Sequence, residues 1–338
     1  VDTKTLSAEQ FDTSWWQRFS NSRNKQDDFS HEVLDAMNGC LACKSCSSQC
    51  PVKVDVPDFR SKFLSIYYQR YMRPMKDHLV GNIERMAPIM AKFSPVVNLF
   101  LKRKWMQNGI EKTIGYVDTP ILSEPTLANR VKGKVATYNH DALSKLSAQE
   151  KQKTVLIVQD PFTSYYDASV VEDFVTLVNA LGFTPVMLPF KPNGKPQHVK
   201  GFLNEFKATA KNAAQFLNSL SEINAPLVGL DASLVMCYRD EYNSILGDDR
   251  GDFEVLLAHE WLAKESFKPL ANKIKNETRF TLLSHCTETT AMPSAANVWQ
   301  TIFSDLGLQL NTTATGCCGM AGTYGHEIQN QANSRALY

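Results

Sequence analysis

The sequence has no long apolar run and no strong excess of charge of one sign. None of its apolar stretches reaches the roughly 18 residues that a membrane-spanning helix needs. Its 36 Lys and Arg residues and 35 Asp and Glu residues leave a formal net charge of +1. Nucleic-acid-binding proteins normally carry a basic excess, so we expect no nucleic-acid partner. The first residues also lack a charged segment followed by an apolar one, which predicts no secretory signal.

The sequence does not have the character of a small disulfide-bonded protein either. It contains 338 residues, 43% of them hydrophobic and 21% charged, which is enough for two domains with a buried core. Four of its eight cysteines lie between positions 40 and 50, and two are adjacent at 317 and 318. Clustered thiols in a long chain without a secretory signal indicate metal binding rather than disulfides. We therefore expect a cytoplasmic location.

The two ends of the sequence suggest a piece of a longer polypeptide. The chain begins at Val1 rather than Met. It ends inside a helix-like stretch, residues 327–338, which has no Gly or Pro stop signal.

The most specific motif is C-x₂-C-x₂-C-x₃-C-P. It is formed by Cys40, Cys43, Cys46 and Cys50. Three thiolates at this spacing can bind one [4Fe–4S] cubane, and in two-cluster ferredoxins the fourth thiolate binds the other cluster. Structural zinc sites usually hold two pairs of ligands well apart, so we favour iron–sulfur over zinc. Only one such motif is present. A partner motif is therefore expected upstream of Val1, and neither cubane would be complete in this chain alone.

The sequence predicts three regions. Residues 1–108 carry helical periodicity broken by prolines, and residues 109–152 are expected to be an extended connection. Within the first region, the stretch Phe93–Trp105 joins apolar residues to a basic cluster. We interpret it as a packed helix with a solvated basic end, in preference to a helix on a membrane surface. Residues 153–338 alternate strands with helices, which indicates an α/β layer with a parallel sheet.

An internal repeat is visible within residues 153–338. Strands at 154–158 and 184–188 enclose a helix at 170–181, and a long helix is expected over 198–220 before a strand at 227–230. A strand at 281–284, a helix at 295–306 and a strand at 308–311 repeat the first part of this plan 125 positions later. The alignment places the loop 191–194 opposite 316–319, so only the second half has cysteines at its strand ends. Ligands bind outside the carboxyl ends of such strands.

Those cysteines form a second candidate site. It consists of Cys286, Cys317 and Cys318. Flanking glycines suit a close backbone approach to a cluster or metal, although buried, inert cysteines are common. His285 and His326 flank the site as ligands, as hydrogen-bond donors or as ordinary satisfied histidines. We interpret Cys237 as a core thiol and residues 160–167 as a helix-capping segment.

These residues give the chain a resemblance to a known family. The first cysteine motif, His285-Cys286 and Gly316-Cys-Cys-Gly-Met-Ala-Gly322 resemble the C-terminal half of bacterial FAD-linked D-2-hydroxyacid dehydrogenases of the D-2-hydroxyglutarate dehydrogenase type. The resemblance implies a helical ferredoxin-like [4Fe–4S] domain followed by an α/β "CCG" (cysteine-rich) domain of two degenerate βαβ repeats, truncated at its C-terminus. The first repeat departs from the family pattern because it has no CCG sequence.

The resemblance also implies an electron-transfer function. A flavin domain, N-terminal in the parent chain and absent here, would bind FAD and oxidise D-2-hydroxyglutarate or D-lactate. Clusters in this portion would pass electrons to a quinone or an electron-transfer protein, with the inner membrane surface as an alternative location. We expect no catalytic residue here and no activity of this portion alone. Two alternatives stay open: a heterodisulfide-reductase-like catalytic subunit, and a zinc-stabilised structural docking module.

Overall fold

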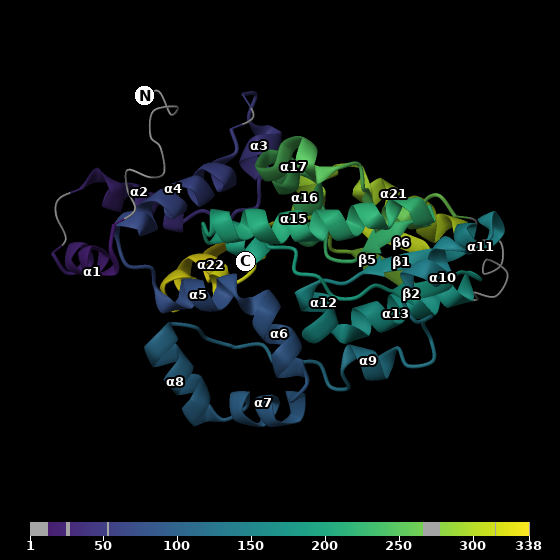
Figure 1. Ribbon diagram of the computed structural model, residues 1–338, viewed down its shortest axis with the longest axis horizontal. Helices are drawn as coiled ribbons and strands as arrows, with labels where there is room; N and C mark the ends of the chain where they lie inside the picture. Colours follow the sequence, from purple (N-terminus) through teal and green to yellow (C-terminus); the bar gives the residue numbers. More distant parts are fainter. Residues whose placement is uncertain (1–12, 25–27, 53, 266–277, 315, 338) are drawn as a thin grey trace.

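The computed structural model describes residues 13–24, 28–52, 54–265, 278–314 and 316–337 (Figure 1). Residues 1–12 of the predicted helical region therefore lie outside the described residues. The N-terminal region is helical, with α1 (Trp15–Arg23), α2 (Phe29–Asn38), α3 (Ser45–Gln49), α4 (Val56–Arg70), α5 (Met75–Gly81), α6 (Ile83–Ala91), α7 (Ser94–Leu101) and α8 (Lys104–Ile114). Side-chain caps start three of these helices: Ser14 accepts from Gln17 N, Asp28 from Ser30 N and Asp55 from Asp58 N. Among the described residues, no helix is both long and apolar enough to cross a membrane.

A four-stranded parallel sheet forms the centre of the C-terminal region. Its order is β2 (Thr184–Met187), β1 (Thr154–Val158), β3 (Leu227–Gly229) and β4 (Val255–Leu257). The associated helices are α12 (Pro161–Tyr165), α13 (Ala168–Ala180), α14 (Lys195–Val199), α15 (Leu203–Ser219), α16 (Ala232–Arg239), α17 (Glu241–Leu246) and α18 (Ala258–Leu262). Helices α15 and α13 lie on opposite sides of the sheet (Figure 1). Val155, Leu156 and Ile157 are buried, as expected of a strand that is covered on both faces.

A second, two-stranded sheet repeats this plan. It consists of β5 (Arg279–Leu282) and β6 (Gln309–Thr312), with helices α20 (Cys286–Ala291) and α21 (Ala295–Asp305). Thr154 lies opposite Thr184 in the first sheet, and Arg279 lies opposite Gln309 in the second. Each residue of the second pair lies 125 positions after its counterpart. The chain then continues through 3₁₀ turns into α22 (Gln331–Leu337).

The loops after the second strand of each unit also correspond. Gly194 in the first unit and Gly319 in the second both have positive φ, at 85° and 70°. The same holds for Gly182 and Gly307, which end the preceding helices at 85° and 75°. Gly is favoured at such positions because other residues are strained there.

Three sequence expectations differ from the structure. Residues 109–152 are not extended throughout, because α8 runs to Ile114 and three short helices follow: α9 (Leu127–Arg130), α10 (His140–Ser144) and α11 (Ala148–Gln152). Helices of four or five residues are too short to show a periodic pattern. The helix expected over 198–220 is broken between α14 and α15. At the break, Gly201 has φ of +70°, and a Cβ there would overlap the α4 backbone.

The third difference concerns Phe93–Trp105. The segment is helical, but several of its apolar side chains are exposed, whereas we expected a packed helix. The face of α7 that is buried carries Ser94 and Asn98.

Buried ion pairs and hydrogen bonds join the helical region to the α/β region. Lys200, after α14, contacts Asp77 of α5 at 3.0 Å and Glu327 of the C-terminal segment at 2.9 Å. Ser61 of α4 donates to the His198 carbonyl at 2.5 Å. These contacts fix the helical region against one end of the sheet, where the cysteines lie.

Candidate metal centre

The first cysteine motif lies on a sharply turned loop between α2 and α4. Cys40 and Cys43 belong to the loop, Cys46 lies in α3, and the amide of Cys50 closes α3 by donating to the Cys46 carbonyl at 3.0 Å. All four thiols are half-buried.

Two loop residues have unusual backbone conformations. Ala42 and Lys44 have φ of 54° and 59°, in the left-handed region. This conformation costs an L-residue roughly 1–2 kcal/mol, so it persists only where the surrounding structure imposes it. Backbones that alternate in this way turn their N–H groups towards a common side, as in many anion and iron–sulfur sites. The loop is therefore a suitable cradle for a negatively charged cluster.

A network of ion pairs attaches this loop to the α/β region. Lys44, between two motif cysteines, forms ion pairs with Asp240, with Glu241 at 3.1 Å and with Asp55 at 3.2 Å. Glu241 also pairs with Lys195 of α14. Burial opposes the charged form of Lys44, yet the neighbouring Glu241 and Asp240 carboxylates hold its pKa above the ordinary value. Two cations therefore lie beside the motif.

The three other candidate cysteines lie together at the end of the second sheet. Cys286 begins α20, and Cys317 and Cys318 follow β6. Burial raises the pKa of the Cys286 thiol, and the nearby Cys318 and Cys317 sulfurs raise it further. The amide of Gly319 donates to the Cys317 sulfur at 3.4 Å. A Cβ on Gly319 would overlap the Ser334 backbone, so glycine permits the close approach of α22.

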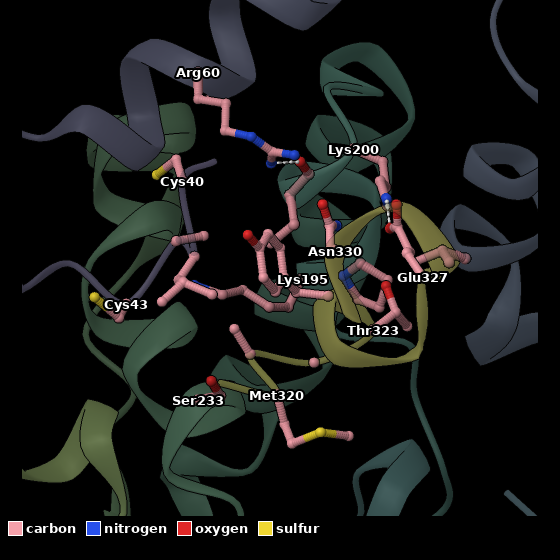
Figure 2. A pocket seen from close by; sticks show the side chains of 18 of the residues that line it. Cys40, Cys43, Arg60, Lys195, Lys200, Ser233, Met320, Thr323, Glu327 and Asn330 are labelled. Carbon is pink, nitrogen blue, oxygen red and sulfur yellow. Dashed lines mark hydrogen bonds and ion pairs between the residues drawn. The ribbon is translucent and has the colours of Figure 1, made fainter. Parts of the chain in front are cut away.

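The two cysteine regions face one cavity. Its volume is about 390 Å³, and its walls include Cys40, Cys43, Cys286 and Cys318. Figure 2 shows Cys40 and Cys43 on one side and Glu327 and Asn330 of the C-terminal segment on the other. Helix α3 packs against α20, so the two motifs are also neighbours along the wall. A sequence separation of more than 230 residues between the two motifs hid this proximity.

The thiols have suitable chemistry for binding iron, but among the described residues they do not form a ligand group. Within the described ranges, no three or more Cys, His, Asp or Glu side chains form a group arranged to hold a metal ion. The donor set is nevertheless four thiols at cluster spacing, on a strained loop beside two half-buried lysines. The residues present therefore fit an iron–sulfur cluster by donor type and spacing.

The remaining sequence candidates have ordinary roles. His285 lines the cavity and caps α20 by accepting from Thr287 N at 3.3 Å. His326 lies against the Val117 carbonyl at 3.2 Å. Asp160 caps α12 by accepting from Phe162 N and Thr163 N, both at 2.8 Å, which confirms the capping prediction. Cys237 is fully buried, which confirms it as a core thiol.

Sequence reasoning missed the buried carboxylate of Glu84. This α6 residue is 2% exposed and accepts from Asn193 N at 2.8 Å and Gly194 N at 2.7 Å. Asn193 and Gly194 are the repeat counterparts of Cys318 and Gly319. In the first unit, the α6 helix of the helical region thus contacts the loop whose counterpart in the second unit carries cysteines. Nothing in a single Glu at a helical position signals this.

Glu84 should make the stability depend on pH. Burial raises its pKa from 4.5 to about 7. Because the folded pKa lies above the unfolded one, the folded chain binds more protons between these values, and the free energy of unfolding should fall as pH rises from 4.5 to 7. We expect Glu84→Gln to remove up to about 3 kcal/mol of this fall. Urea unfolding between pH 4.5 and 8 measures it.

The exposed Glu222→Gln serves as the control for this measurement. An unchanged pH slope in Glu84→Gln would contradict the assignment.

Known proteins resemble the chain over most of its length. The D-2-hydroxyglutarate dehydrogenase of Escherichia coli (strain K12) is 53% identical over 312 residues, which are 92% of this chain and 31% of that protein. The enzyme of the same name from Haemophilus influenzae is 50% identical over 96% of this chain and 33% of its own length. One of the subunits of anaerobic glycerol-3-phosphate dehydrogenase from Escherichia coli (strain K12) is 23% identical over 78% of this chain and 66% of its own length.

No family model matches the chain, and no solved structure does. The chain spans about a third of the length of the D-2-hydroxyglutarate dehydrogenases that it matches. These relatives are dehydrogenases, and at about 50% identity the similarity indicates common ancestry. The chain is therefore homologous, over more than nine-tenths of its length, to one part of bacterial D-2-hydroxyglutarate dehydrogenases.

Proposed function

We propose that this chain is the iron–sulfur electron-transfer portion of an FAD-linked oxidoreductase that acts on a D-2-hydroxy acid. The observation that carries the proposal is the first cysteine motif, held on a loop with two left-handed residues beside two half-buried lysines. The names of the relatives support the substrate class, D-2-hydroxyglutarate before D-lactate. In this proposal residues 1–108 are a ferredoxin-like domain and residues 153–338 a CCG domain of two degenerate repeats.

Within this proposal the residues divide into ligands and supports. The first cubane would be held by Cys40, Cys43 and Cys46, and Cys50 would reach a second cluster. Bound clusters supply one-electron transfer. Lys44 and Lys195, through their ion pairs with Asp55, Asp240 and Glu241, would hold the motif loop against the α/β region. The left-handed residues Ala42 and Lys44 orient the loop.

The second site would add a ligand set of its own. Cys286 and Cys318 border the same cavity, and Cys317 lies close enough to affect the pKa of Cys286, so their clustering supports a metal or cluster there. The flavin would belong to the parent protein, where a flavin domain would deliver electrons to this portion. The onward acceptor would be a quinone or an electron-transfer protein.

Metal analysis tests the proposal. Anaerobically purified chain should contain iron and acid-labile sulfide, below four irons per chain if a second motif is needed to complete each cubane. Reduction with dithionite should produce an electron paramagnetic resonance signal. Zinc without sulfide would overturn the iron–sulfur assignment and favour the structural docking module. Reduction of these centres by D-2-hydroxyglutarate, compared with D-lactate, in the complete enzyme tests the substrate class.

One observation favours a second candidate, a protein that cleaves disulfides. The cavity of about 390 Å³ is large enough for a small ligand and is bordered by Cys286 and Cys318. Turnover of a small disulfide by the reduced protein, lost in Cys318→Ser, would support this candidate over simple electron relay.

A further inference from the structure

Helix α7 is oriented with its polar face towards the protein. Ser94 and Asn98 are its buried residues. The Asn98 side chain donates to the Leu122 carbonyl at 2.9 Å and accepts from Leu122 N at 2.9 Å. Its other face carries Val96, Leu99 and Phe100, which are 46–55% exposed. A helix on a globular protein normally shows the opposite arrangement, so this apolar face is built to be covered.

The exposed apolar surface continues onto the neighbouring helices. Phe93 and Trp105 are 61% and 63% exposed, and Ile89 of α6 is 61% exposed. Phe100 and Trp105 pack edge to face at the corner between α7 and α8, with centroids 6.4 Å apart. Helix α8 has no buried residue. In Figure 1 α7 and α8 form the outer edge of the molecule, away from both sheets.

Basic side chains surround this surface. Between positions 92 and 112 the sequence has five basic residues and one acidic residue, in a chain whose formal net charge is only +1. Lys92, Lys102, Arg103 and Lys104 are all exposed. Three of them lie at the corner beside Phe100 and Trp105. We call the whole surface the corner patch: Ile89, Lys92, Phe93, Val96, Leu99, Phe100, Lys102, Arg103, Lys104 and Trp105.

We propose that the corner patch docks the protein onto an anionic membrane surface. Exposed aliphatic and aromatic side chains rimmed by Lys and Arg are the combination that inserts into the interface of anionic lipids. The chain would lie on the surface without crossing it, since no described helix is suited to span a bilayer. This inference uses none of the cysteines and is independent of the proposed redox function.

Charge separates this occupant from the main rivals. A second copy of the chain would bring two basic corners together, and like charges oppose such a contact. A protein partner would have to present an acidic rim around an apolar centre. An anionic lipid surface offers both features at once.

Vesicle sedimentation tests the proposal. The whole chain should sediment with equimolar phosphatidylglycerol and phosphatidylcholine vesicles, and it should stay in solution with phosphatidylcholine alone or at high salt. The triple variant Lys102→Gln/Arg103→Gln/Lys104→Gln should bind at least about tenfold more weakly. Phe100→Ser/Trp105→Ser should also weaken binding, and lowering the salt concentration should not restore it. All these residues are exposed, so the variants should have the same thermal unfolding curve as the unsubstituted chain.

Matched controls come from other surfaces. Lys132→Gln/Lys153→Gln/Lys207→Gln removes three exposed charges elsewhere, and Trp16→Ser/Phe29→Ser removes two exposed aromatic rings. Both control variants should bind the vesicles as strongly as the unsubstituted chain does. Equal loss in controls and corner variants would overturn the proposal, as would no binding to anionic vesicles. Lipid-free dimerisation that Phe100→Ser abolishes would assign the patch to a second copy instead.

Discussion

Replacing Lys200 with methionine is expected to lower the free energy of unfolding by about 3–5 kcal/mol. Lys200 is 6% exposed and neutralises two buried carboxylates, Asp77 at 3.0 Å and Glu327 at 2.9 Å. Glu327 keeps Lys76 at 2.7 Å, but Asp77 has no other ion pair among those found in the described residues. The variant therefore leaves a buried charge uncompensated. Urea unfolding at pH 7 measures the loss.

Two further variants show whether charge is the cause. Lys207→Met, at an exposed position of α15, should leave stability nearly unchanged. Lys200→Met/Asp77→Leu removes both members of the pair and should recover a large part of the loss, because no lone buried charge remains. If the double variant were as unstable as the sum of the two single ones, the pairing explanation would fail.

Replacing Cys43 with serine should remove most of the iron and acid-labile sulfide from the purified chain. Cys43 supplies one of three closely spaced thiolates, and a hydroxyl is a poor substitute for a thiolate in binding iron. Ser and Cys are similar in size, so far-ultraviolet circular dichroism should change little. Iron content, sulfide content and the dithionite-reduced paramagnetic signal provide the measurement.

The matched control is Cys237→Ala, which removes a buried thiol outside both candidate sites. The Cys237→Ala chain should keep the iron content of the unsubstituted chain, although the cavity left by the substitution is expected to lower its stability. If Cys43→Ser held as much iron and sulfide as the unsubstituted chain, the first motif would be excluded as the cluster site.

Local spacing carried the predictions that the structure confirms. The repeat at 125 positions was visible because strand, helix and glycine signals recur in one order, and β5 and β6 lie where that offset places them. The capping role of Asp160 is likewise a matter of three consecutive positions. Each of these signals depends on residues a few positions apart, so it can be recognised from the sequence alone.

Contacts between distant segments were beyond sequence reasoning. The pairing of Lys200 with both Asp77 and Glu327 joins three segments, and no property of the separate residues announces it. The break at Gly201 was missed because its cause is the close approach of α4. For α7, periodicity located the helix but not its orientation, since which face is buried depends on where Leu122 offers its backbone to Asn98.

The contact of Glu84 with the loop at Asn193 and Gly194 limits how the two regions can be recombined. In a chimaera with the helical region of a distant relative, that region must supply a carboxylate at this position of α6, or two buried amides lose their acceptor. The converse exchange would leave the carboxylate buried without donors. The two regions are thus structurally matched at this contact, and a chimaera that respects only their boundaries in sequence would lose it.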